Sequence, residues 1–424
     1  MFKLFSGSIG TRLIGMAFTF FSGMMLAKEL GAENFGIYSF VMALVSVLAI
    51  PSQSGFANLV IKEISPLKQN EDKHVISSII KWIKKRNILF AFIITTFSII
   101  ILILIYISGA IPIVDNAPIV FLLGFISVLF LGSNVIGYSI LKARKRLLLG
   151  QFIEACLYPI SFFIFITTVS LFGWLNTESA MLIRLASLTV VFLTCVIFCK
   201  KYYSKKLSNE LSLQEKSRLN KLIVSLSLSD GIRVLQANIP LVVMGIILFP
   251  QEVGVFKVAQ SLLLFVGLPA TVIATMMAPD IAKGYKQHDE FNLESKIRQY
   301  NKMYLGVMLI TSVIVYFLSE YVIQITFGSD YLESGLMLII MTFSMALSSC
   351  FGLSDLVMNM TERNDLVLKS SLISLVFSVT SAFLLVYCYG VWGGVASYCV
   401  SHLFYRAYLY TLAKKNYRFK IAII

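Results

Sequence analysis

The sequence predicts an all-α polytopic membrane protein of about twelve transmembrane helices, arranged as two six-helix bundles around a central cavity. Three observations lead to this fold class. Apolar residues make up 58% of the 424 residues, while charged residues make up only 14%. Long apolar runs recur along the chain with short polar breaks between them. Basic residues gather in alternate breaks, as the positive-inside rule expects of a membrane protein.

The composition excludes two simpler classes of protein. A soluble domain carries roughly 25% charged residues, and the interior of a soluble chain grows too slowly with length to bury so much apolar surface. Disordered chains are poor in hydrophobic residues, whereas this chain has a mean hydropathy of +0.83. Twelve spans of about 20 residues would use roughly 240 residues, close to the apolar content. The composition therefore fits a lipid bilayer as solvent.

Apolar runs of span length follow one another through the whole chain. The first run reads as a retained span, because it lacks a convincing small-residue cleavage site. The third run is apolar almost throughout and is expected to face lipid. We expect spans over 8–27, 36–60, 88–108, 119–141, 151–172, 180–199, 222–248, 255–278, 303–318, 334–358, 367–389 and 394–412.

The charges between the spans predict the orientation. With both termini cytoplasmic, Lys and Arg cluster in the inside loops and acidic residues lie in the outside connections. The inside clusters lie at 61–87, 142–146, 200–221 and 414–420, and the outside acids are Asp115, Glu178, Glu252, Glu320, Asp330 and Glu333. This alternation accounts for most of the net charge of +14. No nucleic-acid partner is therefore expected.

An internal repeat with an offset of 218 residues divides the chain into two halves. Gly36 aligns with Gly254, Pro51 with Pro269 and Lys84 with Lys302. Six spans in each half place both halves in the same orientation, which predicts parallel repeats related by an axis along the membrane normal. We expect one six-helix bundle over 1–210 and a second over 211–424.

The residues give no sign of a metal site, a nucleotide site or an enzyme active site. The six cysteines lie inside apolar stretches and read as small buried hydrophobes, and the three histidines are far apart in sequence. No Gly-x-x-x-x-Gly-Lys sequence occurs, so ATP hydrolysis is not expected. The outside loops are too short for an extracytoplasmic catalytic domain. No cofactor is expected, apart from a coupling H⁺ or Na⁺.

Charged residues inside the predicted spans are the candidate site residues, because each costs about 2.5–3.5 kcal/mol at the bilayer centre. Arg12 shares a helical face with Gly15, Thr19 and Ser22, which suits the lining of a cavity. The alternative is an arginine whose side chain reaches to the cytoplasmic interface.

Asp230 and Arg233 lie three residues apart on one face of the seventh span, ahead of Pro240, which can kink the helix. A charged pair beside a broken helix is typical of a transporter site at the membrane midplane, although a structural ion pair within the helix is the alternative.

The remaining candidates divide by charge. Lys257, Arg184 and Arg406 are basic, and each could bind an anionic group or extend to the interface. Glu154 and Asp355 are acidic, with Asp355 expected on one helical face with Ser344 and Ser348. Together with Asp230 they are candidates for a coupling ion, or they neutralise a neighbouring arginine.

Four segments carry a resemblance to a known family. Leu30-Gly31-Ala32-Glu33-Asn34-Phe35-Gly36-Ile37-Tyr38 resembles the turn after the first span of polysaccharide flippases, in the O-antigen and capsule branch of the multidrug/oligosaccharidyl-lipid/polysaccharide exporter superfamily. The stretches 252–281, Phe327-Gly328-Ser329-Asp330-Tyr331 and Tyr389-Gly390-Val391-Trp392-Gly393-Gly394-Val395-Ala396 resemble further patterns of that family. The resemblance covers nearly the whole chain.

The resemblance implies a flippase in the bacterial inner membrane that moves undecaprenyl-diphosphate-linked oligosaccharides outward by alternating access, in O-antigen, capsule or exopolysaccharide synthesis. Arg12, Arg233 and Lys257 are then the expected diphosphate contacts, with Arg184 and Arg406 as further cavity residues. A polymerase and a chain-length regulator of the same pathway are expected partners. The alternatives are a cation-coupled multidrug exporter, a lipid II flippase or, less in keeping with the short outside loops, a membrane polysaccharide polymerase.

Overall fold

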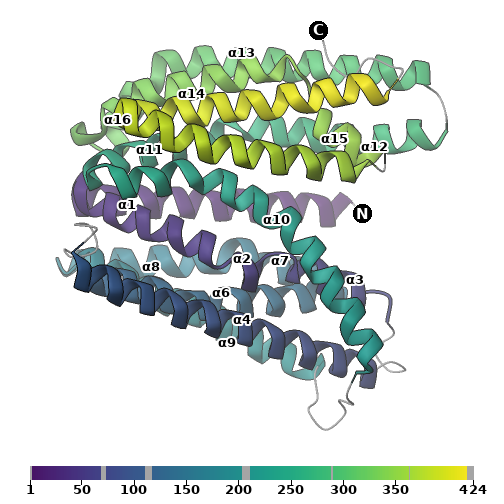
Figure 1. Ribbon diagram of the computed structural model, residues 1–424, viewed down its shortest axis with the longest axis horizontal. Coiled ribbons are helices and arrows are strands. Elements are labelled where there is room, and N and C mark those ends of the chain that lie inside the picture. The colour runs from purple at the N-terminus through teal and green to yellow at the C-terminus, as the bar shows by residue number, and fades with distance from the viewer. Residues whose placement is uncertain are drawn as a thin grey trace. The chain divides into compact units, whose positions relative to one another are not determined.

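The computed structural model describes residues 2–67, 73–109, 117–202, 211–287, 290–361 and 363–417, which form helices and no strands (Figure 1). The helices are α1 (Phe2–Leu48), α2 (Ile50–Gln53), α3 (Phe56–Ile64), α4 (Lys73–Ser108), α6 (Pro118–Ala143), α7 (Leu147–Phe152), the π-helix η1 (Ile153–Leu157), α8 (Tyr158–Leu171), α9 (Thr177–Cys199), the 3₁₀-helix η2 (Lys200–Tyr202), α10 (Leu213–Ile247), α11 (Pro250–Val266), α12 (Leu268–Lys286), α13 (Glu290–Thr326), the 3₁₀-helix η4 (Ser329–Tyr331), α14 (Glu333–Ser349), α15 (Ser354–Met360) and α16 (Asn364–Asn416).

The helices agree with the predicted number of spans. Within the described residues, nine helical segments are long and apolar enough to cross a membrane, and α14 with α15 forms a tenth that is bent by 49°. α16 contains two of the predicted spans joined at a kink, and α1 contains the first predicted span and, beyond its own kink, the beginning of the second, which continues through α2 and α3. An all-α polytopic membrane protein with about twelve spans is therefore confirmed.

The kinks in α1 and α16 lie at Gly31 and Gly390, inside the glycine motifs noted in the sequence. Their φ angles are +69° and +57°, in a region that an L side chain rarely adopts. In Figure 1 the purple chain of α1 runs away from the N-terminus and returns toward α2, and α16 reverses in the same way. These two glycines therefore turn the chain between consecutive spans.

The chain divides into two compact units, unit 1 over Met1–Asn238 and unit 2 over Ile239–Ile424. The division lies inside α10, one residue before Pro240, which removes a backbone donor from the helix. The sequence places its boundary earlier, at 210/211, next to residues 203–210, which lie outside the described part of the chain. The first part of α10 therefore packs with unit 1, although it opens the second half of the sequence repeat.

Unit 1 is built around α6, which contacts α9, α4, α3 and α1. One apolar core joins α3, α4, α6, α9 and the beginning of α10, with the buried side chains of Leu59, Ile83, Ile136, Val191 and Ile223 at its centre. Burying side chains of this size stabilises the unit by about 1.5–3 kcal/mol each in water, and by closer van der Waals packing within a membrane.

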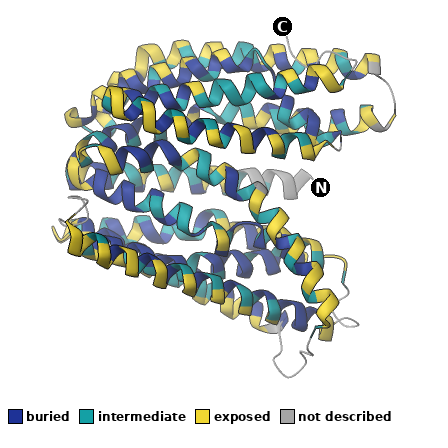
Figure 2. Cartoon of the chain, in the orientation of Figure 1, coloured by how far each residue is buried: buried dark blue, intermediate teal, exposed yellow. Residues whose placement is uncertain are grey.

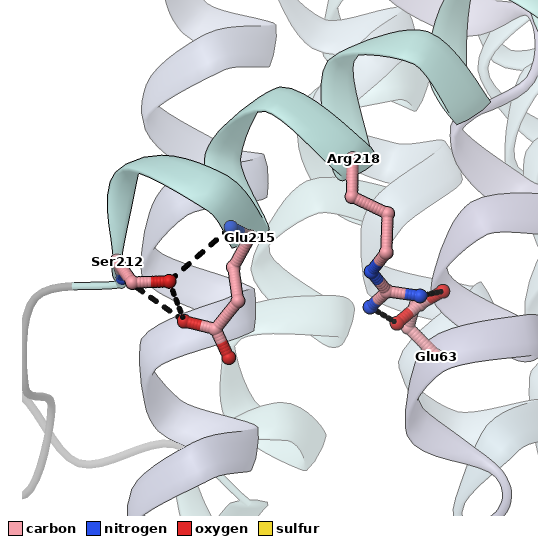
Figure 3. A network of polar contacts seen from close by, with 4 residues as sticks. All are labelled: Glu63, Ser212, Glu215 and Arg218. Carbon is pink, nitrogen blue, oxygen red and sulfur yellow. Dashed lines mark hydrogen bonds and ion pairs between the residues drawn. The ribbon is translucent and has the colours of Figure 1, made fainter.

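Polar contacts also bind the first part of α10 to unit 1. Arg218 donates through both terminal nitrogens to the Glu63 carboxylate of α3, at 3.2 and 2.5 Å (Figure 3). One turn earlier, Ser212 and Glu215 bond to each other's backbone nitrogens in a capping box that begins the helix (Figure 3). Further along, Ser227 Oγ donates to the Ser54 carbonyl at 2.6 Å.

Unit 2 contains α11 to α16, with α13 packed on α14 and α12 and with α14 packed on α16. The break between α14 and α15 passes through Gly352, whose φ is +67°. A Cβ at this position would lie 2.6 Å from the Asn301 amide. The fully buried Asn301 of α13 accepts a hydrogen bond from the backbone N–H of Leu353. A backbone donor at the start of α15, which has no partner within its own helix, is thereby satisfied.

The two halves keep the predicted repeat in their helix starts. Pro51 and Pro269 each lie in the first turn of the helix that follows a break in the second span of their half, α2 and α12. Proline is favoured at this point because its missing N–H would have no partner there.

Exposed apolar side chains cover the outer faces of the long helices, as Figure 2 shows in yellow along α4. In α4 they include Ile88, Phe92, Phe97, Leu104 and Ile107, with exposed fractions of 51% or more. A face this apolar is compatible with lipid and not with water. The expectation that the 88–108 run faces lipid agrees with this exposure.

Candidate functional site

The predicted pair of Asp230 and Arg233 is present on α10 and includes a third residue. Arg233 Nη2 donates to Asp230 Oδ1 at 2.6 Å, and Asn58 Nδ2 of α3 donates to Asp230 Oδ2 at 2.9 Å. The Arg233 side chain is 73% exposed and that of Asp230 is 25% exposed. Asp230 is thus held from both sides, while most of the Arg233 guanidinium stays accessible.

The residues predicted to share one face of the first span lie in two different environments. Arg12 and Thr19 are exposed, whereas Gly15 and Ser22 are buried. Gly15 faces the π-helix η1 so closely that a Cβ would lie 1.9 Å from the Ala155 carbonyl oxygen. Helix packing therefore explains the small residue at position 15, and Arg12 is the basic group that remains on the open surface.

Arg184 lies inside unit 1 with a side chain that is 5% exposed. Its Nη1 donates to the hydroxyl of Tyr158 on α8 at 3.1 Å, and the guanidinium also lies near the hydroxyl of Tyr38 of α1. Its Nε is buried without a hydrogen-bond partner among the described residues. The guanidinium contacts neutral tyrosines rather than a carboxylate, so its charge is only partly compensated.

Glu154 lies in η1 and forms an ion pair with Lys142, which lies in the last turn of α6. The Glu154 side chain is 36% exposed and that of Lys142 is 16% exposed. A π-helical turn inside a longer helix is often found at functional sites, and here it turns Glu154 toward α6. The pair joins two consecutive spans next to the loop that connects them.

Asp355 and Arg406, considered separately in the sequence, form one ion pair in unit 2. Arg406 Nη1 lies 2.5 Å from Asp355 Oδ1, with side-chain exposures of 15% and 32%. His402 lies one turn before Arg406, and its Nδ1 is buried without a hydrogen-bond partner among the described residues. The pair joins the last span to the short helix α15 after the break.

The expectation that Asp355 shares a helical face with Ser344 and Ser348 is wrong. The two serines lie in α14, whereas Asp355 lies in α15, beyond the positive φ of Gly352 and the 49° bend. A periodicity argument assumes an unbroken helix, and Asp355 lies in the next helix. Ser344 donates to the Cys399 carbonyl of α16, the helix whose Arg406 pairs with Asp355.

Lys257 lies in α11 and is partly buried. Its Nζ donates to Gln260 Oε1 at 3.0 Å, one turn further along the same helix. This contact is again to a neutral group. Lys257 and Arg184 are therefore alike in being basic, embedded in their unit and hydrogen-bonded to neutral partners.

The structure also contains partners that the sequence analysis did not single out. They are Asn58, which donates to Asp230 from 172 positions away, and Lys142, which pairs with Glu154. The third is Tyr38, which lies near Arg184. Only Tyr38 carried a signal, because it closes the glycine motif after the first span. Among the described residues, no three His, Cys, Asp or Glu side chains converge as metal ligands, and the six cysteines are free thiols.

Solved structures of membrane transporters share the fold. Lipid II flippase MurJ, in an inward closed conformation, matches with a TM-score of 0.77 at 15% identity, over 98% of this chain and 88% of that one. An inward-facing multidrug resistance MATE family transporter matches with a TM-score of 0.78 at 12% identity, over 96% and 97%. A transporter from Pyrococcus furiosus matches with a TM-score of 0.61 at 14% identity, over 97% and 94%. The protein thus has the fold of the MOP superfamily of transporters and flippases.

The family follows from the sequence match. A family model described as polysaccharide biosynthesis protein matches residues 25–336, and the chain belongs to this family. Capsular polysaccharide biosynthesis protein CapF of Staphylococcus aureus is 25% identical over 206 residues, which cover 48% of this chain and 52% of CapF. The matched region spans about half of that relative's length. The resemblance to polysaccharide flippases is confirmed at the level of family and fold.

Proposed function

We propose that the protein carries undecaprenyl-diphosphate-linked oligosaccharide repeat units from the cytoplasmic to the outer leaflet of the bacterial inner membrane, for capsule, O-antigen or exopolysaccharide synthesis. The family and its capsular relative support polysaccharide precursors as the cargo class. The fold supports alternating access between two helical units as the mode of transport. Both termini are taken as cytoplasmic, in line with the basic inside loops.

One observation carries the choice of an anionic cargo. The three candidate carboxylates each have a basic partner: Asp230 has Arg233, Glu154 has Lys142 and Asp355 has Arg406. After this pairing the candidate spans still contain further bases. Arg184 and Lys257 hydrogen-bond neutral groups, and Arg12 is exposed. The balance of charge in these spans is positive.

A diphosphate has the chemistry to compensate that balance. Arginine binds phosphate oxygens through two parallel hydrogen bonds, and such bonds strengthen where water is scarce. In this proposal, the exposed Arg12 and Arg233 contact the diphosphate, and Lys257 is a further candidate contact. Arg184 and Arg406, at 5% and 15% side-chain exposure, support the shape of their units and the local charge.

Energy coupling to H⁺ or Na⁺ is part of the same proposal. A coupling ion at Asp230, Glu154 or Asp355 would compete with the basic side chain already there. Asp230 is the best placed of the three, because Arg233 is 73% exposed and is free to turn toward a substrate while the ion replaces it. Loss of transport on collapse of both gradients is the expected result.

The cargo is tested by deleting the gene in its own host and analysing lipid-linked sugars. We expect an undecaprenyl-diphosphate oligosaccharide to accumulate in the inner leaflet and surface polysaccharide to be lost. Unchanged surface polysaccharide with raised drug sensitivity would support the multidrug exporter instead. Arrest of cell-wall synthesis with accumulated lipid II would support the lipid II flippase.

The site is tested in the same strain by complementation. Arg12→Ala and Arg233→Ala should each lower the translocation rate about tenfold or more, because a charge-assisted hydrogen bond contributes about 1.5–3 kcal/mol. Arg12→Lys and Arg233→Lys keep the charge and should retain part of the activity. Lys415→Ala, at an exposed position at the end of α16, is the matched control. Full activity in both alanine variants, at normal membrane levels, refutes the assignment.

A further inference from the structure

A groove in unit 1 lies apart from the residues of the proposed transport site. It has a volume of about 210 Å³ and runs between α4, α6 and α9. Its walls are mostly hydrocarbon, from Ile88, Ile136, Ile140, Phe192 and Val196. None of the eight candidate transport residues lines it.

The groove opens onto the apolar outer surface of the unit. Two of its lining residues, Ile88 of α4 and Val196 of α9, are 58% and 46% exposed. The exposed apolar surface continues from them along both helices, to Phe92 at 62% on α4 and to Leu193 at 53% on α9. In a membrane such a surface contacts lipid chains, so hydrocarbon is the material that reaches the groove.

Two polar side chains, Lys84 and Asn87, line the groove from α4, and Ser133 lines it from α6. Lys84 lies one turn before Ile88, where the basic first part of α4 gives way to its apolar run. Asn87 is fully buried, and its Nδ2 donates a hydrogen bond to the Ser52 carbonyl oxygen. Its Oδ1 is buried without a hydrogen-bond partner among the described residues, although the residue lines the groove. A buried acceptor of this kind is stabilised by a ligand that donates a hydrogen bond.

We propose that this groove binds a membrane phospholipid of the phosphatidylglycerol type. The phosphate lies at the Lys84 ammonium, a headgroup hydroxyl donates to Asn87 Oδ1, and an acyl chain follows Ile88 and Val196. Basic pockets between transmembrane helices bind anionic headgroups in this way. A phosphatidylcholine headgroup has the same phosphate but no net negative charge, because its quaternary ammonium neutralises the phosphate. It also has no N–H or O–H to donate to Asn87 Oδ1, so it should bind more weakly.

The test uses the purified full-length chain in detergent and native mass spectrometry with added lipid. We expect phosphatidylglycerol to be retained at least fivefold more tightly than phosphatidylcholine of the same chains. Lys84→Gln should weaken phosphatidylglycerol about fivefold, which corresponds to about 1 kcal/mol for one basic residue near the membrane surface. Val196→Trp keeps every charge, fills the groove from an exposed wall position, and should weaken binding at least as much.

Lys85→Gln is the matched control, since Lys85 is the exposed neighbour of Lys84 and does not line the groove. It should change binding less than twofold. An equal loss in Lys85→Gln refutes the site, because general attraction to a basic surface then explains the binding. Equal retention of the two lipids, or no effect of Val196→Trp in folded protein, also refutes it. Tighter retention of a polyprenyl phosphate than of phosphatidylglycerol replaces the phospholipid with the carrier lipid and refutes the proposal as stated.

Discussion

The ion pair between Asp355 and Arg406 should be a main support of unit 2, and Asp355→Asn measures it. The Arg406 side chain is only 15% exposed, so loss of the carboxylate leaves an uncompensated cation in a largely buried position. Removing one partner of a fully buried pair costs about 3–5 kcal/mol. Because the Asp355 side chain is 32% exposed, water replaces part of the lost contact, and we expect about 2 kcal/mol.

The assay is thermal unfolding of the purified full-length chain in detergent, followed by tryptophan fluorescence. For a unit of 150–250 residues, each kcal/mol shifts Tm by about 2–4 °C, so Asp355→Asn should lower Tm by about 4–8 °C. The double variant Asp355→Asn with Arg406→Gln removes both charges and should lose less than the sum of the two single variants, by at least 1 kcal/mol. Asp365→Asn, exposed in the first turn of α16, is the control and should cost about 0.5 kcal/mol or less.

Additivity decides the matter. If the two single variants and the double variant add within about 0.5 kcal/mol, the two side chains do not interact in solution and the reasoning fails. A loss in Asp365→Asn as large as in Asp355→Asn refutes it as well, because a general charge effect then explains both.

Two further predictions concern packing and pH. Gly15→Ala should lower Tm and the yield of monodisperse protein, because the new Cβ would lie 1.9 Å from the Ala155 carbonyl oxygen. The control Gly10→Ala places its Cβ in open space and should be neutral or stabilising by about 0.5–1 kcal/mol. Equal effects of the two substitutions would refute the close contact at Gly15. Burial raises the pKa of Tyr331 above its usual value of about 10, so the folded state holds the proton more tightly. The stability contributed by Tyr331 is fully present below pH 10 and falls as the pH rises above it. Tyr331→Phe should therefore lessen the loss in Tm between pH 9 and pH 11. An identical dependence of Tm on pH in the variant excludes Tyr331 as the cause.

The sequence predicted those parts of the fold that depend on local chemistry. Gly31 lies in the turn expected after the first span, and its φ is positive, as few other residues allow. Gly390, with the same property, lies between the predicted spans 367–389 and 394–412. Pro51 and Pro269 marked corresponding helix starts in the two halves. The division of unit 1 from unit 2 inside α10 had no such signal, because it depends on which side chains α10 meets in space.

The same distinction holds for the candidate site. Asp230 and Arg233 were predicted as a pair, because three residues along one helix fix their proximity whatever the rest of the chain does. The contact between Asn58 and Asp230 spans 172 positions, and that between Asp355 and Arg406 spans 51, so both depend on tertiary packing. Asp355 also shows where periodicity fails, since the break at Gly352 resets the helical phase before it.

The distribution of charge separates the proposed cargo from its main alternative. A carboxylate paired with a basic residue attracts a cation fully only after that base has moved away, and Asp230, Glu154 and Asp355 are all paired in this way. A cationic drug that enters between these spans would meet unneutralised bases. Its binding would be opposed by the free energy of its own desolvation and by repulsion between like charges. A diphosphate would meet the opposite, since each phosphate oxygen brought to Arg12 or Arg233 offsets the desolvation of both partners. The surplus of bases over available carboxylates therefore favours an anionic cargo on energetic grounds, independently of the family to which the chain belongs.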